Sequence, residues 1–340
     1  MPTNVTPQYR KLEEEYRRAS DPDEQLRLLQ EMMAEIPKHK GTEHVRADLK
    51  RKMAELRAES GVKKGPGSRQ VSAFHVDREG AGQIVMVGMP NVGKSALVDA
   101  LTGASPEVSP SPFTTWEPMP GMMFIDPEGS DHGNVQVQLV DTPPLNEEFM
   151  KPELFHLIRA ADIMAIVVDL QAFPIEQYET ALRLLEEHKT VPAQLQSSYR
   201  AVHPEERGVT FIPAIVLANK VDDEERDEDF AVLGELLETE LPLLPISATT
   251  LRHAYRFKAL VFEMLGIVRV YAKPPGKEPD FSEPFVMYRG GTVETFAGQV
   301  HRDLLKSLKS ARVWGTGVYD GQTVSRDHVL HDGDLVELRT

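Results

Sequence analysis

The middle of the chain alternates between two kinds of hydrophobic pattern. Short apolar runs, two of them almost uninterrupted, are typical of buried parallel strands and lie at residues 83–88, 135–141, 163–170, 211–219 and 243–246. Longer stretches with apolar residues at helical spacing lie between them, at residues 95–101, 175–188, 230–238 and 254–265. Strands that alternate with helices predict an α/β fold with a doubly wound, mostly parallel sheet, which binds ligands at the carboxyl ends of its strands.

Both ends of the chain have a different pattern. Residues 1–70 are rich in good helix formers and predict a helical hairpin followed by a Gly/Pro/basic linker at 61–70. Residues 268–340 predict an α+β module, with one amphipathic helix at 293–308 and short strands at 285–288, 311–315, 322–324 and 335–338. The expected domains are therefore 1–70, 71–267 and 268–340.

Composition and charge narrow the class of protein. The 340 residues include no cysteine, which excludes disulfides, cysteine nucleophiles and thiolate zinc sites. The net charge is −15, yet residues 1–70 carry 15 Lys/Arg against 12 Asp/Glu, so an RNA partner for the ends of the chain stays open beside the plainer interpretation of solvated surface charge. The apolar runs are shorter than the roughly 20 residues that span a bilayer, and the first residues lack a secretory signal. We expect a cytoplasmic protein with no membrane partner.

The segment GMPNVGKS fits G-x-x-x-x-G-K-[ST] and lies between a predicted strand and a predicted helix, the context that this motif requires. Its glycine-rich backbone lets N–H groups point inward at phosphate oxygens, and the helix N-terminus adds partial positive charge. We expect Lys94 to neutralise the β- and γ-phosphates and the Ser95 hydroxyl to bind Mg²⁺. The predicted phosphate cradle consists of Gly88, Met89, Pro90, Asn91, Val92, Gly93, Lys94 and Ser95.

A second motif selects the base. Asn219, Lys220 and Asp222 follow a buried strand in the pattern N-K-x-D. A carboxylate there can accept both the N1–H and the N2–H of guanine, whereas adenine offers no matching donor pair, and losing such a pair costs on the order of several kcal/mol. Ser247 and Ala248 follow the next strand, where a backbone amide can cover the guanine O6. The sequence therefore predicts a guanine nucleotide.

Two further elements are candidates for sensing the γ-phosphate. Asp141 ends an alternating strand and fits a water-mediated Mg²⁺ contact. Phe113, Thr114 and Thr115 lie in the loop before it, and either threonine could reach the metal. We expect Lys94, Thr115 and Asp141 to serve catalysis, and Ser95, Thr115 and Asp141 to hold Mg²⁺.

These motifs together resemble the Obg/DRG branch of the translation-factor-related GTPases. The likeness is carried by GMPNVGKS, FTTWEPMPGMM, DTPP, LANKVDD and ISAT, and by IPKHKGTEH near the N-terminus, which is similar to the developmentally regulated GTP-binding proteins. The tail, with VRVYAKPPGKEPDF and ARVWGTGVYDGQTVSRDHVLHDGDLVEL, resembles a TGS domain, a small β-grasp module. The resemblance implies a P-loop GTPase in which Thr115, rather than Thr114, is the switch threonine on Mg²⁺. It also implies ribosomes or other RNA assemblies as partners, reached through the TGS domain and the N-terminal arm.

The chain departs from the family pattern in the stretch after Asp141. Pro144 replaces the DxxG glycine whose amide contacts the γ-phosphate, and proline has no N–H. Leu145 stands where Ras-like enzymes place a water-orienting glutamine. Related GTPases with a hydrophobic residue there use a potassium ion, held partly by the P-loop asparagine that matches Asn91. Residues 191–208 read as a polar loop, and the extra domain that DRG proteins carry has no room between Asp141 and Asn219.

Three functions compete on this evidence. The first is a GTPase that hydrolyses GTP slowly, as a conformational switch, because neither a glutamine nor an arginine finger is visible in cis. The second is a module that holds guanine nucleotides and barely hydrolyses them, which the two prolines after Thr142 favour. The third, an ATP-using P-loop kinase, requires the N-K-x-D motif to be accidental.

Overall fold

The computed structural model describes residues 74–103, 117–125, 135–146, 150–281 and 283–340, together with Leu12, Tyr16, Leu28, Leu29 and Met32 of the N-terminal segment. The chain divides into two compact units, Met1–Val71 and Ser72–Thr340. In the first unit all five described residues are helical, and Leu28, Leu29 and Met32 are buried. The rest of the predicted hairpin and the linker lie outside the described residues.

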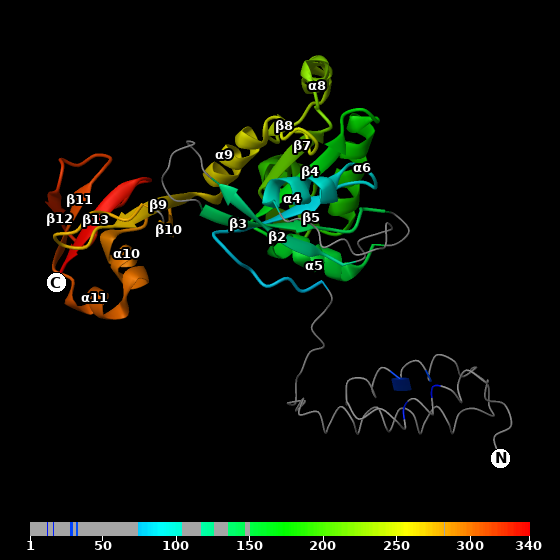
Figure 1. Cartoon of the computed structure of the whole chain (residues 1–340). Coiled ribbons are helices and arrows are strands. Elements are labelled where there is room, and N and C mark those ends of the chain that lie inside the picture. Colours follow the sequence, from blue (N-terminus) through cyan, green and yellow to red (C-terminus); the bar gives the residue numbers. More distant parts are fainter. Residues whose placement is uncertain are drawn as a thin grey trace. The chain divides into compact units, whose positions relative to one another are not determined.

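A six-stranded sheet in the order β2-β3-β1-β4-β7-β8 forms the centre of the second unit (Figure 1). All neighbouring pairs are parallel except β2 and β3. The strands are β1 (Gln83–Val87), β2 (Met119–Ile125), β3 (Val135–Asp141), β4 (Ile163–Asp169), β7 (Ala214–Asn219) and β8 (Leu243–Pro245). The predicted mostly parallel α/β sheet is confirmed, and β2 is an antiparallel edge strand that the sequence analysis did not identify.

Helices cover both faces of this sheet. Alternate residues of β1 enter two separate hydrophobic cores, Ile84 and Met86 in one and Val85 and Val87 in the other. The first core contains residues of α4 (Lys94–Thr102) and α9 (Ala254–Leu265), and the second contains residues of α5 (Pro152–Ala160), α6 (Pro174–Glu187) and α8 (Glu224–Leu236). Burial of both faces explains why the central strands are nearly continuous in apolar residues.

The segment between α6 and β7 folds, although the sequence analysis expected a polar loop at 191–208. It contains β5 (Thr190–Pro192), the 3₁₀ helix η1 (Ala193–Leu195), α7 (Gln196–Val202) and β6 (Thr210–Ile212), and β5 and β6 pair as a small sheet of their own. The Gln194 side chain bonds both the carbonyl and the N–H of Ala214, at 2.8 and 3.1 Å. The loop prediction was wrong because such side-chain contacts leave no periodic signal. The run at 211–219 is likewise divided, since Pro213 separates β6 from β7.

A five-stranded sheet in the order β10-β9-β13-β11-β12 forms the C-terminal domain. Its elements are β9 (Ile267–Ala272), β10 (Phe285–Tyr288), α10 (Val293–Val300), α11 (Arg302–Ser307), β11 (Ser310–Trp314), β12 (Gln322–Val324) and β13 (Asp334–Arg339). The single helix expected at 293–308 is in fact two helices. His301 adopts an extended conformation between them, and its ring nitrogen accepts the N–H of Asp303 at 3.1 Å, which starts α11.

Elsewhere the helix limits differ from the predicted ones for local reasons. The start of α8 lies at Glu224 rather than at residue 230, because the Asp223 carboxylate caps the helix by accepting the Arg226 N–H at 3.0 Å. Helix α5 and strand β9 were not predicted. Among the described residues, none of the helices is both long and apolar enough to cross a bilayer.

Candidate functional site

The loop between β1 and α4 fits closely against its neighbours. Gly88 and Gly93 have positive φ angles of 154° and 89°, which side chains rarely adopt. A Cβ atom at Gly88 would collide with the carbonyl oxygen of Val167 on β4, and one at Gly93 would collide with the side-chain amide of Asn219. Glycine is required at these two positions because the loop backbone has no room for a side chain there.

Lys94 holds its charge inside this loop. The side chain is buried, and its Nζ donates to the carbonyl oxygens of Gly88 and Met89, each at 3.1 Å. Burial lowers the pKa of Lys94 to about 8, although nearby Asp141 acts in the opposite direction. Because Lys94 also begins α4, its ammonium and the positive end of a helix converge on one place, which suits phosphate oxygens.

Two hard oxygen groups lie together at the end of β3. The Ser95 hydroxyl donates to Asp141 Oδ2 at 2.5 Å. Asp141 is buried, and this desolvation raises the pKa of its carboxyl, while the Ser95 hydrogen bond and the Lys94 charge lower it. A hydroxyl and a carboxylate are ligands that Mg²⁺ accepts, so this pair fits the ion that the motif implies. Phe113, Thr114 and Thr115, predicted to complete the site, lie outside the described residues.

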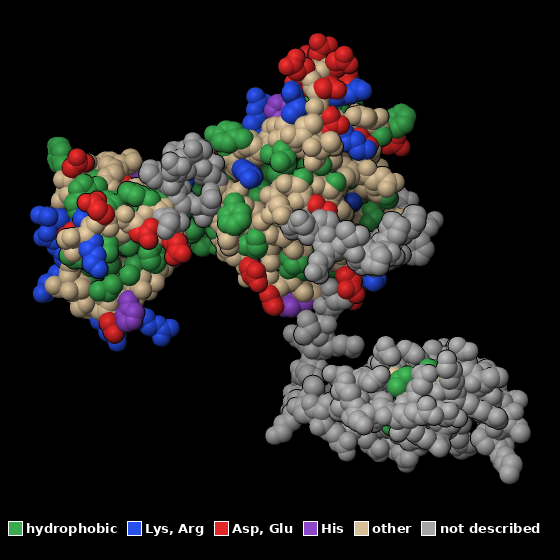
Figure 2. Space-filling model, in the orientation of Figure 1, with side chains coloured by type: hydrophobic (Ala, Val, Ile, Leu, Met, Phe, Trp, Pro, Cys, Tyr) green, Lys and Arg blue, Asp and Glu red, His purple; other side chains and the backbone are tan. Residues whose placement is uncertain are grey.

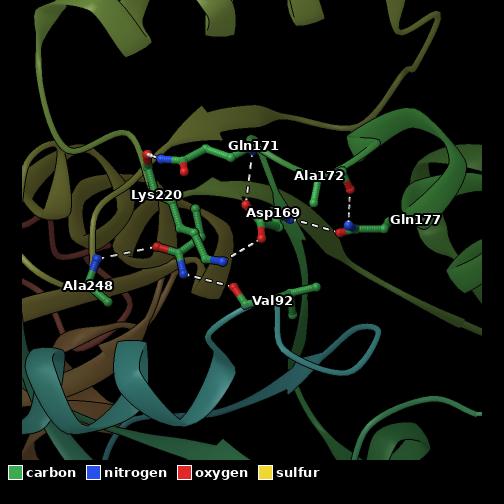
Figure 3. A network of polar contacts seen from close by, with 8 residues as sticks. Val92, Asp169, Gln171, Ala172, Gln177, Lys220 and Ala248 are labelled. Atoms are coloured by element: carbon green, nitrogen blue, oxygen red, sulfur yellow. Dashed lines mark hydrogen bonds and ion pairs between the residues drawn. The ribbon is translucent and has the colours of Figure 1, made fainter.

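Asn219 joins the phosphate loop to the base motif, and its partners Val92 and Ala248 are labelled in Figure 3. It ends β7 with a fully buried side chain, whose Nδ2 donates to the Val92 carbonyl at 2.9 Å. Its Oδ1 accepts the N–H of Ala248 at 3.3 Å. Three segments far apart in the sequence are thereby held together by one side chain.

Asp222 is held by the segment after β8. The Ser247 hydroxyl donates to Asp222 Oδ1 at 2.6 Å and accepts the N–H of Thr250 at 2.9 Å. Asp222 is half-buried and its second carboxylate oxygen has no hydrogen bond to the part of the chain that the structure describes. The predicted base residues Asn219, Asp222, Ser247 and Ala248 therefore do come together.

Comparison with known proteins finds two family models that match parts of this chain. Residues 83–197 match the family model described as "50S ribosome-binding GTPase", and residues 268–340 match the model of the TGS domain. The chain has the fold of a P-loop GTPase. It continues into a C-terminal TGS domain, and we refer to residues 72–266 as the G domain.

Relatives of this chain align with nearly its whole length. An uncharacterized GTP-binding protein of Methanocaldococcus jannaschii is 26% identical and aligns with 93% of this chain and 92% of its own. Developmentally-regulated G-protein 1 of Arabidopsis thaliana is 27% identical, with 93% and 90% covered. The solved structure of the Schizosaccharomyces pombe YchF GTPase has a TM-score of 0.53 at 13% identity, covers 78% of this chain and all of its own, and shares the fold.

The G domain contains one functional candidate that the sequence analysis missed. Asp169 ends β4, and its carboxylate receives the Lys220 ammonium at 2.5 Å and the Gln171 N–H at 2.9 Å (Figure 3). Gln171 in turn donates to the Lys220 carbonyl at 3.2 Å. Lys220 itself has a φ of 70°, so a bulky residue is held in the left-handed region. An acidic residue at the same sheet edge as Asn219 was the available signal.

The stretch after Asp141 is anchored to the phosphate loop. The Thr142 hydroxyl donates to the Met86 carbonyl at 2.6 Å, and the Leu145 N–H donates to the Gly88 carbonyl at 3.0 Å. The Leu145 side chain is fully buried in the core that contains Val87. The G domain therefore offers neither a polar side chain at position 145 nor an N–H at Pro144.

Proposed function

We propose that this GTPase binds GTP and Mg²⁺ and hydrolyses GTP to GDP and phosphate as a conformational switch. The observation that carries the proposal is the buried Asn219 side chain, which bonds the phosphate loop through Val92 and the base segment through Ala248. A guanosine nucleotide spans these two segments, with its phosphates at one and its base at the other. The relatives that are named as developmentally regulated G-proteins favour the DRG-like branch over other GTPases.

Each end of the nucleotide has its own recognition groups in this proposal. At the phosphates, the Lys94 ammonium exchanges its carbonyl partners for phosphate oxygens. Ser95 and, through a water, Asp141 would hold Mg²⁺, and this ion would neutralise phosphate charge. At the base, the Asp222 carboxylate accepts from guanine N1–H and N2–H. Asp169 keeps the Lys220 side chain in place beside the base.

Hydrolysis needs an oriented water, and Leu145 does not supply a polar group for it. We propose that Thr115 would help to hold Mg²⁺ and that Asn91 would partly hold a potassium ion, which would supply the missing polarity. Asn91 is exposed at the tip of the phosphate loop with a φ of 64°, so its side chain is accessible to an ion. Turnover should be slow without an external activator.

The proposed partner follows from the family description and from the two terminal regions of the chain. The G domain model carries the description "50S ribosome-binding GTPase", and the chain adds a TGS domain and a basic N-terminal segment. We propose that these regions report the nucleotide state to ribosomes or other RNA assemblies in the cytoplasm. Co-sedimentation with ribosomal fractions that depends on a GTP analogue and weakens with added salt would support this.

A second function has one observation in its favour. Pro144 provides no N–H for the γ-phosphate, so GTP and GDP could be held alike, in a module that barely hydrolyses. Equal affinities for GDP and a non-hydrolysable GTP analogue would favour this module, since a ligand pair of equal affinity shifts no equilibrium. Single-turnover hydrolysis with and without potassium, in the presence and absence of ribosomes, separates the two functions.

The base contact is tested by Asp222→Asn. The hydrogen bonds that the carboxylate makes to guanine are charge-assisted, and their loss costs about 3 kcal/mol in total. GTP affinity should therefore fall roughly 100-fold, while xanthosine triphosphate should bind more tightly. Asp223→Asn is the matched control, because the neighbouring Asp223 caps α8 and should leave both affinities unchanged. Unchanged GTP binding by Asp222→Asn would disprove the base assignment.

A further inference from the structure

An apolar groove lies between α6 and α8, away from the phosphate loop. It encloses about 810 Å³. Its apolar lining includes Leu170, Phe173, Ile175, Val232, Leu233 and Leu236. Three of these side chains are strongly exposed, namely Phe173 at 80%, Leu236 at 63% and Val232 at 54%. Exposed apolar side chains that cluster in one place, rather than scattering singly, mark a binding surface.

On the α8 side of the groove, apolar residues have the spacing of a helix face that packs against a partner. Val232, Leu233 and Leu236 are separated as i, i+1 and i+4 and form one apolar stripe, of which only Leu233 is buried against the G domain. None of the described residues covers the part of this stripe that faces the groove. An exposed apolar stripe of this kind usually binds the apolar face of an amphipathic helix from another chain.

Phe173 adds an independent observation. It precedes α6 with φ 51° and ψ 56°, a left-handed conformation that costs a bulky residue roughly 1 kcal/mol or more and that buries nothing here. The turn is fixed from both sides, because the Gln177 side chain bonds the N–H of Asp169 and the carbonyl of Ala172 (Figure 3). A strained conformation that the surrounding contacts enforce, and that presents an aromatic ring to solvent, points to a function for that ring.

The charge around the groove selects the partner. Glu176, Glu179 and Asp229 line it, and Arg226, the one basic lining residue, already pairs with Asp229 at 2.6 Å. Figure 2 shows acidic side chains gathered over α8, where Glu224, Glu225, Glu228 and Glu235 lie outside the groove lining and Asp227 is paired with Arg252 and His253. Nucleic acid and anionic lipid are repelled by such a rim, whereas lysine and arginine side chains are attracted.

We propose that this groove binds an amphipathic helix of a partner protein, with leucine-like anchors facing Phe173 and Leu236 and with Lys/Arg on its flanks. The site also adjoins the base motif, because the turn that carries Phe173 begins at Asp169, which holds Lys220. Occupation of the groove is therefore expected to change the rate of nucleotide release. The docking itself does not depend on the proposed function.

The test uses the full chain and two labelled synthetic peptides of 14 residues, chosen at about four helical turns. Both carry leucine at positions i, i+3, i+4 and i+7, with lysine elsewhere in one and glutamate elsewhere in the other. Fluorescence anisotropy should show the lysine peptide binding at least tenfold more tightly than the glutamate peptide. Equal affinities of the two peptides would overturn the proposal.

A matched pair of variants localises the binding. Val232→Asp, in the groove, should weaken the lysine peptide at least tenfold. Val202→Asp, at an exposed position on α7, should leave the affinity unchanged. Phe173→Gly should weaken the peptide and yet leave the thermal midpoint unchanged or raised, because glycine relieves the strain. Equal effects of the two valine variants, or a Phe173→Gly variant that still binds the peptide fully, would also overturn the proposal. Retained guanine-nucleotide binding confirms that each variant is folded, and a failure of the peptide alone leaves the nucleotide assignment intact.

Discussion

Replacing Asn219 with alanine should damage the stability of the G domain and its nucleotide binding together. The change removes the bonds to the Val92 carbonyl at 2.9 Å and to the Ala248 N–H at 3.3 Å. Because Asn219 is only 1% exposed, water does not replace these bonds easily. A buried polar group left without its partner costs about 1–3 kcal/mol, and the longer Ala248 bond belongs at the low end of that range. The expected loss in the free energy of unfolding is therefore roughly 2–4 kcal/mol.

The assay measures thermal unfolding of the full chain without nucleotide and follows the midpoint of the transition in which the G domain unfolds. For a domain of this size, 1 kcal/mol shifts the midpoint by about 2–4 °C, so we expect a fall of roughly 5–15 °C. Gln171→Ala is the control, since it removes a nearby but exposed amide that bonds the Lys220 carbonyl at 3.2 Å, and it should shift the midpoint only slightly. If Asn219→Ala proved as mild as Gln171→Ala, the view of Asn219 as the link between the two segments would be refuted.

Three other predictions rest on the same site. Without nucleotide the pKa of Lys94 is about 8 in the folded chain, against 10.5 for an ordinary lysine, so the unfolded chain keeps this proton to higher pH. The free energy of unfolding should therefore rise by about 3 kcal/mol between pH 8 and 10.5. Urea titrations at several pH values should show this rise in the natural chain and not in Lys94→Met. Asp169→Asn should speed the release of GDP and GTP by the same factor in stopped-flow fluorescence, because Lys220 serves the base rather than the phosphates. The factor should be only roughly threefold to tenfold, because the Lys220 side chain is 38% exposed. A selective effect on GTP would contradict this role. Pro144→Gly restores an N–H and should raise affinity for a GTP analogue over GDP by about tenfold in calorimetry, and no change would mean that the γ-phosphate is held elsewhere.

A structural feature could be predicted from the sequence when the residues that cause it lie close together along the chain. The phosphate loop is recognisable because glycine, lysine and serine do their work within eight consecutive residues between a strand and a helix. Asn219 and Asp222 are recognisable for a similar reason, as they directly follow a buried strand. For these residues chemistry and spacing coincide, so the candidate site could be assembled before its geometry was known.

Features that depend on distant contacts were missed. Strand β2 has exposed apolar residues, Met119 at 57% and Phe124 at 46%, so no burial pattern marks it, and it is placed by its pairing with β3 along seven residues. Asp169 gained a role only when Lys220, far along the chain, was brought against it. The break at His301 was invisible because the apolar residues on both sides keep a helical spacing.

The small sheet of β5 and β6 gives the G domain a place where its length can change. Strands β4 and β7 pair directly from Met164 with Ala214 to Asp169 with Asn219, while the chain between them leaves the central sheet and returns. The excursion carries its own pairing, so a longer or shorter version need not disturb the edge where Asn219 ends. We therefore expect the segment between α7 and β6 to accept a grafted fluorescent reporter without a change at the edge where Asn219 ends.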